Sequence, residues 1–97
     1  MHPRKSKEIQ SILLKKGFTL EPKHKHHEFY YFVVNGKISS VYTYFSHSKK
    51  DYDNFLLSQI KKQLSFDNTS EFEDFLNCPF TETDYLEMLK RKNIINI

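Results

Sequence analysis

The sequence predicts one small α+β domain with a three-stranded antiparallel sheet, built around a β-hairpin that turns at Asn35-Gly36. Two segments rich in aromatic and β-branched residues, 28–34 and 37–45, flank this Asn-Gly pair. Such a pair is the strongest short signal for a two-residue hairpin turn, because both residues tolerate positive φ. Apolar residues at helical spacing stand before and after the hairpin. The length of 97 residues suits one hydrophobic core and is too short for two ordinary domains.

A helix over residues 6–16 is expected before the sheet. Its apolar residues recur at helical spacing; they are Ile9, Ile12 and Leu13. Ser6 is expected to cap its start, and Gly17, which follows two lysines, to end it in the left-handed conformation. An extended segment begins at Thr19-Leu20 and is interrupted by Pro22. We therefore expect this segment to supply the third strand.

Three helices are expected after the hairpin. The first spans residues 51–65, with inward residues Leu56, Leu57, Ile60 and Leu64. Ser70-x-x-Glu73 has the form of a capping box and predicts the start of a short second helix. Thr81-x-x-Asp84 predicts the start of the last one. The predicted order is α-β-β-β-α over residues 1–66, followed by two short helices in an acidic extension, 67–97, of the same domain.

Both faces of the predicted sheet are apolar. Phe29, Tyr31 and Val33 point to one side of the strand, and the residues between them point to the other. Helices can cover only one face of a three-stranded sheet in so short a chain. The second face is covered by the C-terminal residues, by a partner protein or by a second copy of the chain, and the pattern does not separate these alternatives.

Charge is divided unevenly along the chain. Residues 1–66 carry 12 Lys/Arg against 5 Asp/Glu, a net charge of +7, whereas residues 67–97 carry 3 against 7. A basic body favours a polyanionic partner such as RNA, although a solvated basic surface gives the same count. The single cysteine, Cys78, excludes an intrachain disulfide. The sequence contains neither an apolar run of about 20 residues nor a signal-peptide pattern, so we expect a cytoplasmic protein.

The densest polar feature is the cluster His24-Lys25-His26-His27-Glu28, which stands just before the hairpin. Histidine exchanges protons near neutral pH, and RNA carries its own nucleophile, the 2′-OH. A histidine base beside cationic lysines could therefore cleave RNA without a metal. Two other readings stay open. His24 and His26 could bind a metal with Glu28 or His47, or the cluster is only a polar start to the strand.

Several short motifs resemble the HicA toxins, which are small mRNA interferases of toxin–antitoxin pairs. They are Lys16-Gly17-Phe18, Lys23-x-x-His26-His27-x-Phe29, the Asn-Gly-Lys turn and Ser46-His47-Ser48. The resemblance covers residues 6–66. It implies a double-stranded-RNA-binding-like fold, a metal-independent mRNA endoribonuclease of a type II toxin–antitoxin pair without a cofactor, and a HicB-like antitoxin as partner.

The resemblance also places the site. It implies that His26 is the catalytic general acid or base, with His27 or His47 as its helper. RNA contacts are expected at Lys23, His24, Lys25, Lys37, Lys49 and Lys50. His24 and Lys25 stand where the family has Gly and Ser/Thr. This departure supports an alternative function, a non-catalytic RNA-binding or protein-interaction module on the same fold.

Overall fold

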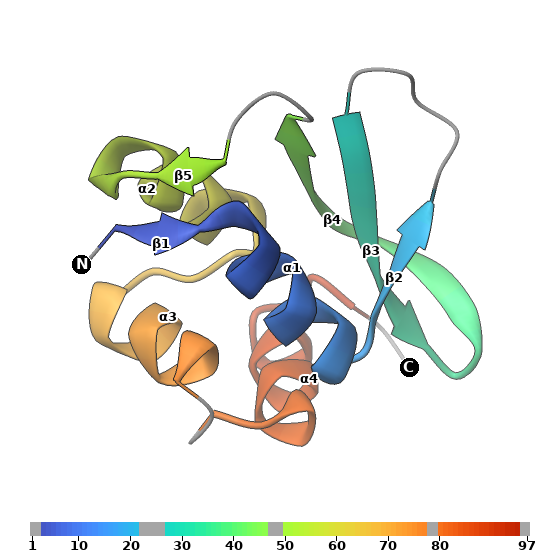
Figure 1. Ribbon diagram of the computed structural model, residues 1–97. Helices are drawn as coiled ribbons and strands as arrows, with labels where there is room; N and C mark the ends of the chain where they lie inside the picture. Colours follow the sequence, from blue (N-terminus) through green and yellow to red (C-terminus); the bar gives the residue numbers. More distant parts are fainter. Residues whose placement is uncertain (1–2, 22–26, 47–49, 78–79, 96–97) are drawn as a thin grey trace.

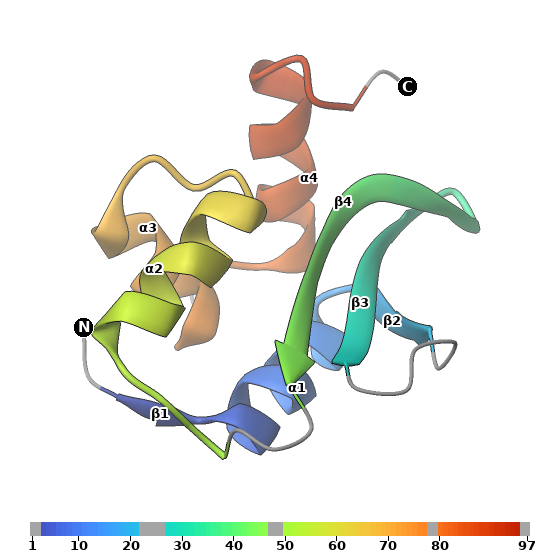
Figure 2. The same cartoon turned by 90° about the horizontal axis from the view of Figure 1, so that it is seen from above.

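A computed structural model describes residues 3–21, 27–46, 50–77 and 80–95. The main sheet is antiparallel, in the order β2 (Phe18–Glu21), β3 (His27–Val34) and β4 (Lys37–Ser46). A second, two-stranded sheet pairs β1 (Arg4–Lys5) with β5 (Asp51–Tyr52). The helices of the described chain lie on one side of the main sheet (Figures 1 and 2). The α+β class and the three-stranded antiparallel sheet are therefore confirmed.

The four helices of the described chain are α1 (Ser6–Lys15), α2 (Asn54–Gln63), α3 (Thr69–Leu76) and α4 (Glu82–Arg91). None of them is both long and apolar enough to cross a membrane. The prediction that Ser6 caps α1 is wrong, because Lys5 occupies the N-cap position. Pairing of β1 with β5 holds the chain extended through Lys5, and the Ser6 N–H donates to the Lys50 carbonyl at 2.8 Å.

Two of the three later helix starts also differ from expectation. Helix α2 begins at Asn54 because residues 51 and 52 form β5, and the Asp53 side chain caps it. Asn68, and not Ser70, caps α3, by accepting from the Glu71 N–H at 2.8 Å. The predicted capping box of α4 is confirmed. The Asp84 N–H donates to Thr81 Oγ1 at 3.1 Å, and the Thr81 N–H donates to Asp84 Oδ2 at 3.0 Å.

The hairpin turn forms as predicted, with φ of 52° at Asn35 and 78° at Gly36. Its register pairs Tyr31 with Tyr42 and Val33 with Ile38, so β4 contains extra residues between two paired positions. Such a bulge bends a strand and increases its twist. Strand β4 accordingly curves around the end of the helical layer (Figure 2).

The core is an aromatic cluster centred on Tyr85 of α4. Its ring lies 5.0 Å from that of Phe32 in β3 and 5.2 Å from that of Phe75 in α3, between ring centroids. Phe18 of β2 and Phe66 lie 5.8 and 5.4 Å away. Tyr85 is fully buried, and its hydroxyl donates to the Leu64 carbonyl at 2.7 Å. Residues 67–97 therefore complete the core that the sheet begins.

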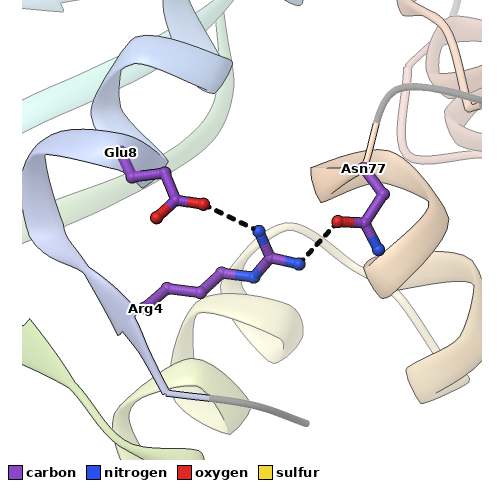
Figure 3. Close-up of polar contacts among 3 residues, drawn as sticks. All are labelled: Arg4, Glu8 and Asn77. Carbon is purple, nitrogen blue, oxygen red and sulfur yellow. Dashed lines mark hydrogen bonds and ion pairs between the residues drawn. The ribbon is translucent and has the colours of Figure 1, made fainter.

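Polar contacts fasten the N-terminal elements to the C-terminal helices. Arg4 donates to Glu8 Oε1 at 3.1 Å and to Asn77 Oδ1 at 2.7 Å, joining α1 to the end of α3 (Figure 3). Lys16 is buried; its ammonium donates to the Phe80 carbonyl and lies 5.3 Å from the centre of the Phe75 ring. Both contacts end on uncharged groups of the C-terminal segment, an amide oxygen of Asn77 and the carbonyl of Phe80.

The ionisation of Tyr85 should make the protein sensitive to alkali. Burial raises the pKa of Tyr85 far above the value of about 10 for a free phenol. The unfolded chain releases this proton first, so the contribution of Tyr85 to the free energy of unfolding should be constant below about pH 10 and fall above it. Burial also raises the pKa of Tyr30 and of Tyr52.

Circular dichroism and phenolate absorbance, measured together during alkaline titration, test this prediction. Tyr85→Phe keeps the ring and removes the hydroxyl, so it should cost about 1 kcal/mol at neutral pH and flatten the alkaline decline. An unchanged alkaline decline in Tyr85→Phe would contradict the buried environment of this phenol.

Candidate functional site

The outer face of the main sheet, opposite the helices, carries a row of rings. Side chains alternate along a strand, so the buried residues of β3 and β4 point to the helices and their neighbours point away. We call this outer row the aromatic face; it consists of His27, Phe29, Tyr31, Tyr42 and Tyr44. Tyr42 and Tyr44 are each 40% exposed. Neither α3 nor α4 covers this face (Figure 1), so these two helices are not its cover.

The Phe and Tyr rings of the aromatic face are nearly parallel to one another. Phe29 stacks against Tyr44 with centroids 5.3 Å apart and planes 24° apart, and against Tyr42 at 5.8 Å and 28°. Tyr31 lies 5.2 Å from Tyr42 at 30°. The cross-strand register accounts for this order, because Phe29 pairs with Tyr44 and Tyr31 with Tyr42. The result is a continuous apolar surface bordered by phenolic hydroxyls.

His27 stands at one end of the aromatic face. Its ring meets Tyr44 edge-on, at 5.3 Å and 82°, and lies 6.3 Å from Phe29 at 71°. It pairs across the sheet with Ser46, the last residue of β4. The other proposed catalytic histidines, His26 and His47, adjoin these two residues in the sequence and lie outside the described residues.

A groove of about 460 Å³ continues from this end of the aromatic face and runs between β4 and α2. The sheet supplies His27, Tyr44 and Ser46; the opposite wall consists of Tyr52, Asp53, Phe55, Leu56, Gln59, Ile60 and Gln63. Phe55 is 69% exposed, the most exposed of the large apolar side chains that the structure describes. Thr43 Oγ1 donates to Gln63 Oε1 at 2.5 Å, which holds α2 against β4.

Tyr52 forms part of the groove wall and is 5% exposed. Burial raises its pKa, and the hydrogen bond that its oxygen accepts from the Ser46 N–H, at 3.2 Å, partly opposes this rise. This bond ties the end of β4 to β5. It fixes the place where the aromatic face passes into the groove.

Lysines surround a second hollow, of about 390 Å³, at the start of α1. Lys5, Lys7 and Lys50 line it together with Ser6, Gln10, Glu28 and Ser46. Ser46 also lines the groove, so the two hollows meet at the end of β4. Lys5 is exposed and lies 3.4 Å from an Asp51 carboxylate oxygen. We name this hollow the lysine pocket.

The structure distributes the predicted RNA contacts unevenly. Lys50 lies in the lysine pocket, near His27, while Lys37 follows the hairpin turn. Since β3 runs from His27 to Val34 and Val34 pairs with Lys37, the strand places Lys37 about 23 Å from the histidine. It is therefore no neighbour of His27. Lys23, His24, Lys25 and Lys49 lie outside the described residues.

Metal ligands are not brought together within the described part of the chain, where no three His, Cys, Asp or Glu side chains converge. Three of the four residues weighed as metal ligands, His24, His26 and His47, fall outside that part.

Sequence reasoning did not identify Tyr42, Tyr44 or Phe55 as functional candidates. The first two were recognisable in principle, since they oppose Phe29 and Tyr31 across the Asn-Gly turn. Phe55 could not be recognised from the sequence, because its exposure depends on where α2 begins.

Comparison of the chain with protein-family models, with curated proteins and with solved structures finds no match.

Accessibility of the aromatic face can be measured by brief acetylation of tyrosines followed by mass spectrometry. We expect Tyr42 and Tyr44 to react first, while Tyr30, Tyr52 and Tyr85, all at most 5% exposed, stay protected until the protein is denatured. Protection of Tyr42 and Tyr44 in the native protein would contradict an open face and indicate that another chain covers it.

Proposed function

We propose that this protein binds single-stranded RNA, with unpaired bases stacked on the aromatic face and phosphates near the lysine pocket. The observation that carries the proposal is the row of nearly parallel Phe and Tyr rings on the aromatic face, together with the lysine pocket at the end of the sheet where β3 begins and β4 ends. Base–aromatic stacking and cationic contacts to the backbone are the two interactions by which proteins hold single-stranded nucleic acid. The net charge of +7 on residues 1–66 supports the same partner.

The aromatic face favours unpaired RNA over a duplex. In an A-form helix the flat faces of the bases are buried in the stack, and proteins contact mainly phosphates and 2′-OH groups. The resemblance to HicA toxins implies a fold that reads such a duplex shape. The position of the rings, outside the helical layer, instead supports contact with splayed bases, as in an mRNA.

Loss of one ring should weaken RNA binding without unfolding the protein. Each stacked base is worth about 1–3 kcal/mol, so Tyr42→Ala should raise the Kd for a single-stranded RNA about 5- to 150-fold. The Kd should also rise with salt, because bound phosphates release counterions. Fluorescence anisotropy with matched single- and double-stranded RNAs measures both effects.

Leu14→Ala is the matched control, since Leu14 is an apolar side chain of α1 that is 53% exposed on the helical side. It should bind RNA like the wild type. Equal Kd values for wild type and Tyr42→Ala, with native circular dichroism in both, would contradict binding on the aromatic face. A Kd that does not respond to salt would contradict the phosphate contacts.

We propose RNA cleavage of the HicA type as a second function, favoured by the position of His27 at the end of the ring row. One histidine would take the proton of a 2′-OH, whose oxygen attacks the adjacent phosphorus. The bond to the 5′-oxygen breaks, and that oxygen takes a proton from a second histidine. The products are a 2′,3′-cyclic phosphate and a free 5′-OH. His26 is the first candidate for the base, with His27 or His47 as helper, and a HicB-like antitoxin would restrain the enzyme.

Cleavage should persist in a chelator and be lost in His26→Ala. Purified protein is incubated with mRNA, and the new ends are analysed for 2′,3′-cyclic phosphate. Expression of the wild type alone should arrest growth, and expression of His26→Ala should not. His2→Ala, which removes a histidine outside the cluster, is the control and should cleave normally.

Intact RNA with the wild type, together with measurable RNA binding, would leave a non-catalytic binding module as the function.

A further inference from the structure

We infer that the groove between β4 and α2 receives one extruded base of the bound RNA and favours a base that carries an exocyclic amine. This inference rests on the proposed function, because it extends the path of the RNA beyond the aromatic face. The groove and the face share two residues, His27 and Tyr44. An RNA strand stacked along the face therefore has the groove beside its end at His27.

Aromatic and aliphatic side chains give the groove a surface for the flat faces of a base. Phe55 on α2 stands opposite Tyr44 on β4, and Leu56 and Ile60 line the wall beside it. Exposure of 69% is costly for a phenylalanine that has no partner, since its apolar surface stays in water. A base lying against this ring would remove much of that surface from water.

The polar groups of the groove suit a base and do not suit a phosphate. Its lining contains Asp53, Gln59 and Gln63 and, among the described residues, no lysine or arginine. A phosphate entering here would meet the Asp53 carboxylate, and His27, which the groove shares with the aromatic face, is the one side chain of this lining that can carry a positive charge. The phosphates have an alternative place in the lysine pocket, which lies on the other side of Ser46.

Asp53 gives the groove its selectivity. One of its oxygens, Oδ1, accepts from the Leu56 N–H at 3.0 Å, which leaves the carboxylate further acceptor positions. Gln59, exposed on the same wall, offers an amide oxygen and an amide nitrogen. A carboxylate is the partner of an exocyclic amine, as on cytosine, and it repels a carbonyl oxygen at that position, as on uracil. Adenine, cytosine and guanine carry such an amine and should therefore be favoured over uracil, which has none.

Binding of three single-stranded homopolymers of equal length, of adenosine, cytidine and uridine, tests the inference. The wild type should bind the adenosine and cytidine strands about tenfold more tightly than the uridine strand. Phe55→Ala should reduce this preference to about twofold or less. Asp53→Asn keeps a capping oxygen for α2 and replaces one acceptor with a donor, so it should move the preference toward uridine. Leu14→Ala should keep the wild-type preference.

The variants distinguish an error in the inference about the groove from an error in the proposal that RNA binds to the aromatic face. Tyr42→Ala could weaken the binding of all three RNA strands while Phe55→Ala and Asp53→Asn keep the wild-type base preference. In that case the inference is overturned and the proposed function stands. A uniform loss of affinity in Phe55→Ala, with the preference intact, also overturns it. If Tyr42→Ala has no effect on any strand, the proposed function fails as well.

Discussion

The packing of Tyr85 against the sheet is the interaction on which the rest of the structure depends. Its ring contacts rings from β2, β3, α3 and the segment after α2, so one side chain joins elements from both ends of the sequence. Its hydroxyl meets the carbonyl of Leu64 at the end of α2. A tyrosine can occupy the centre of an apolar cluster only if its hydroxyl has such a partner. The positions of α2 and α4 are thereby coupled.

In this arrangement the helices cover one face of the sheet and leave the other face uncovered. Phe32 and Phe45 point to the helices and are fully buried, while Tyr42 and Tyr44 point away and remain in contact with water. The inward residues stabilise the core, and the outward residues form the candidate binding surface. Residues of the outer face can therefore change with little cost to the core, which is what a surface selected for recognition requires.

Local signals in the sequence were sufficient at the hairpin turn and at the start of α4, but not at the start of α3, where Asn68 and not Ser70 caps the helix. The hairpin turn at Asn35-Gly36 and the capping box of α4 depend on neighbouring residues and were predicted correctly. Ser6 was misassigned as a cap because the start of α1 is set by a strand partner nearly fifty residues away. The two-faced sheet was predicted, but alternation does not reveal which face the helices take. The histidine cluster ends at the start of β3, where His27 lines the groove, whereas the groove itself depends on the position of α2 and could not be predicted.

The bridge from Arg4 to Asn77 has a consequence for synthesis of the chain. Contacts between residues distant in sequence form late, because the loop between them must close first. Arg4 and Lys16 find partners at positions 77 and 80, and the Phe18 ring needs Tyr85. While the ribosome is still making residues 67–97, the hairpin can form, but Phe32 lacks the cover that Tyr85 supplies. The core therefore stays open until residues 77–85 have emerged from the ribosome, and the sheet completes its packing only then.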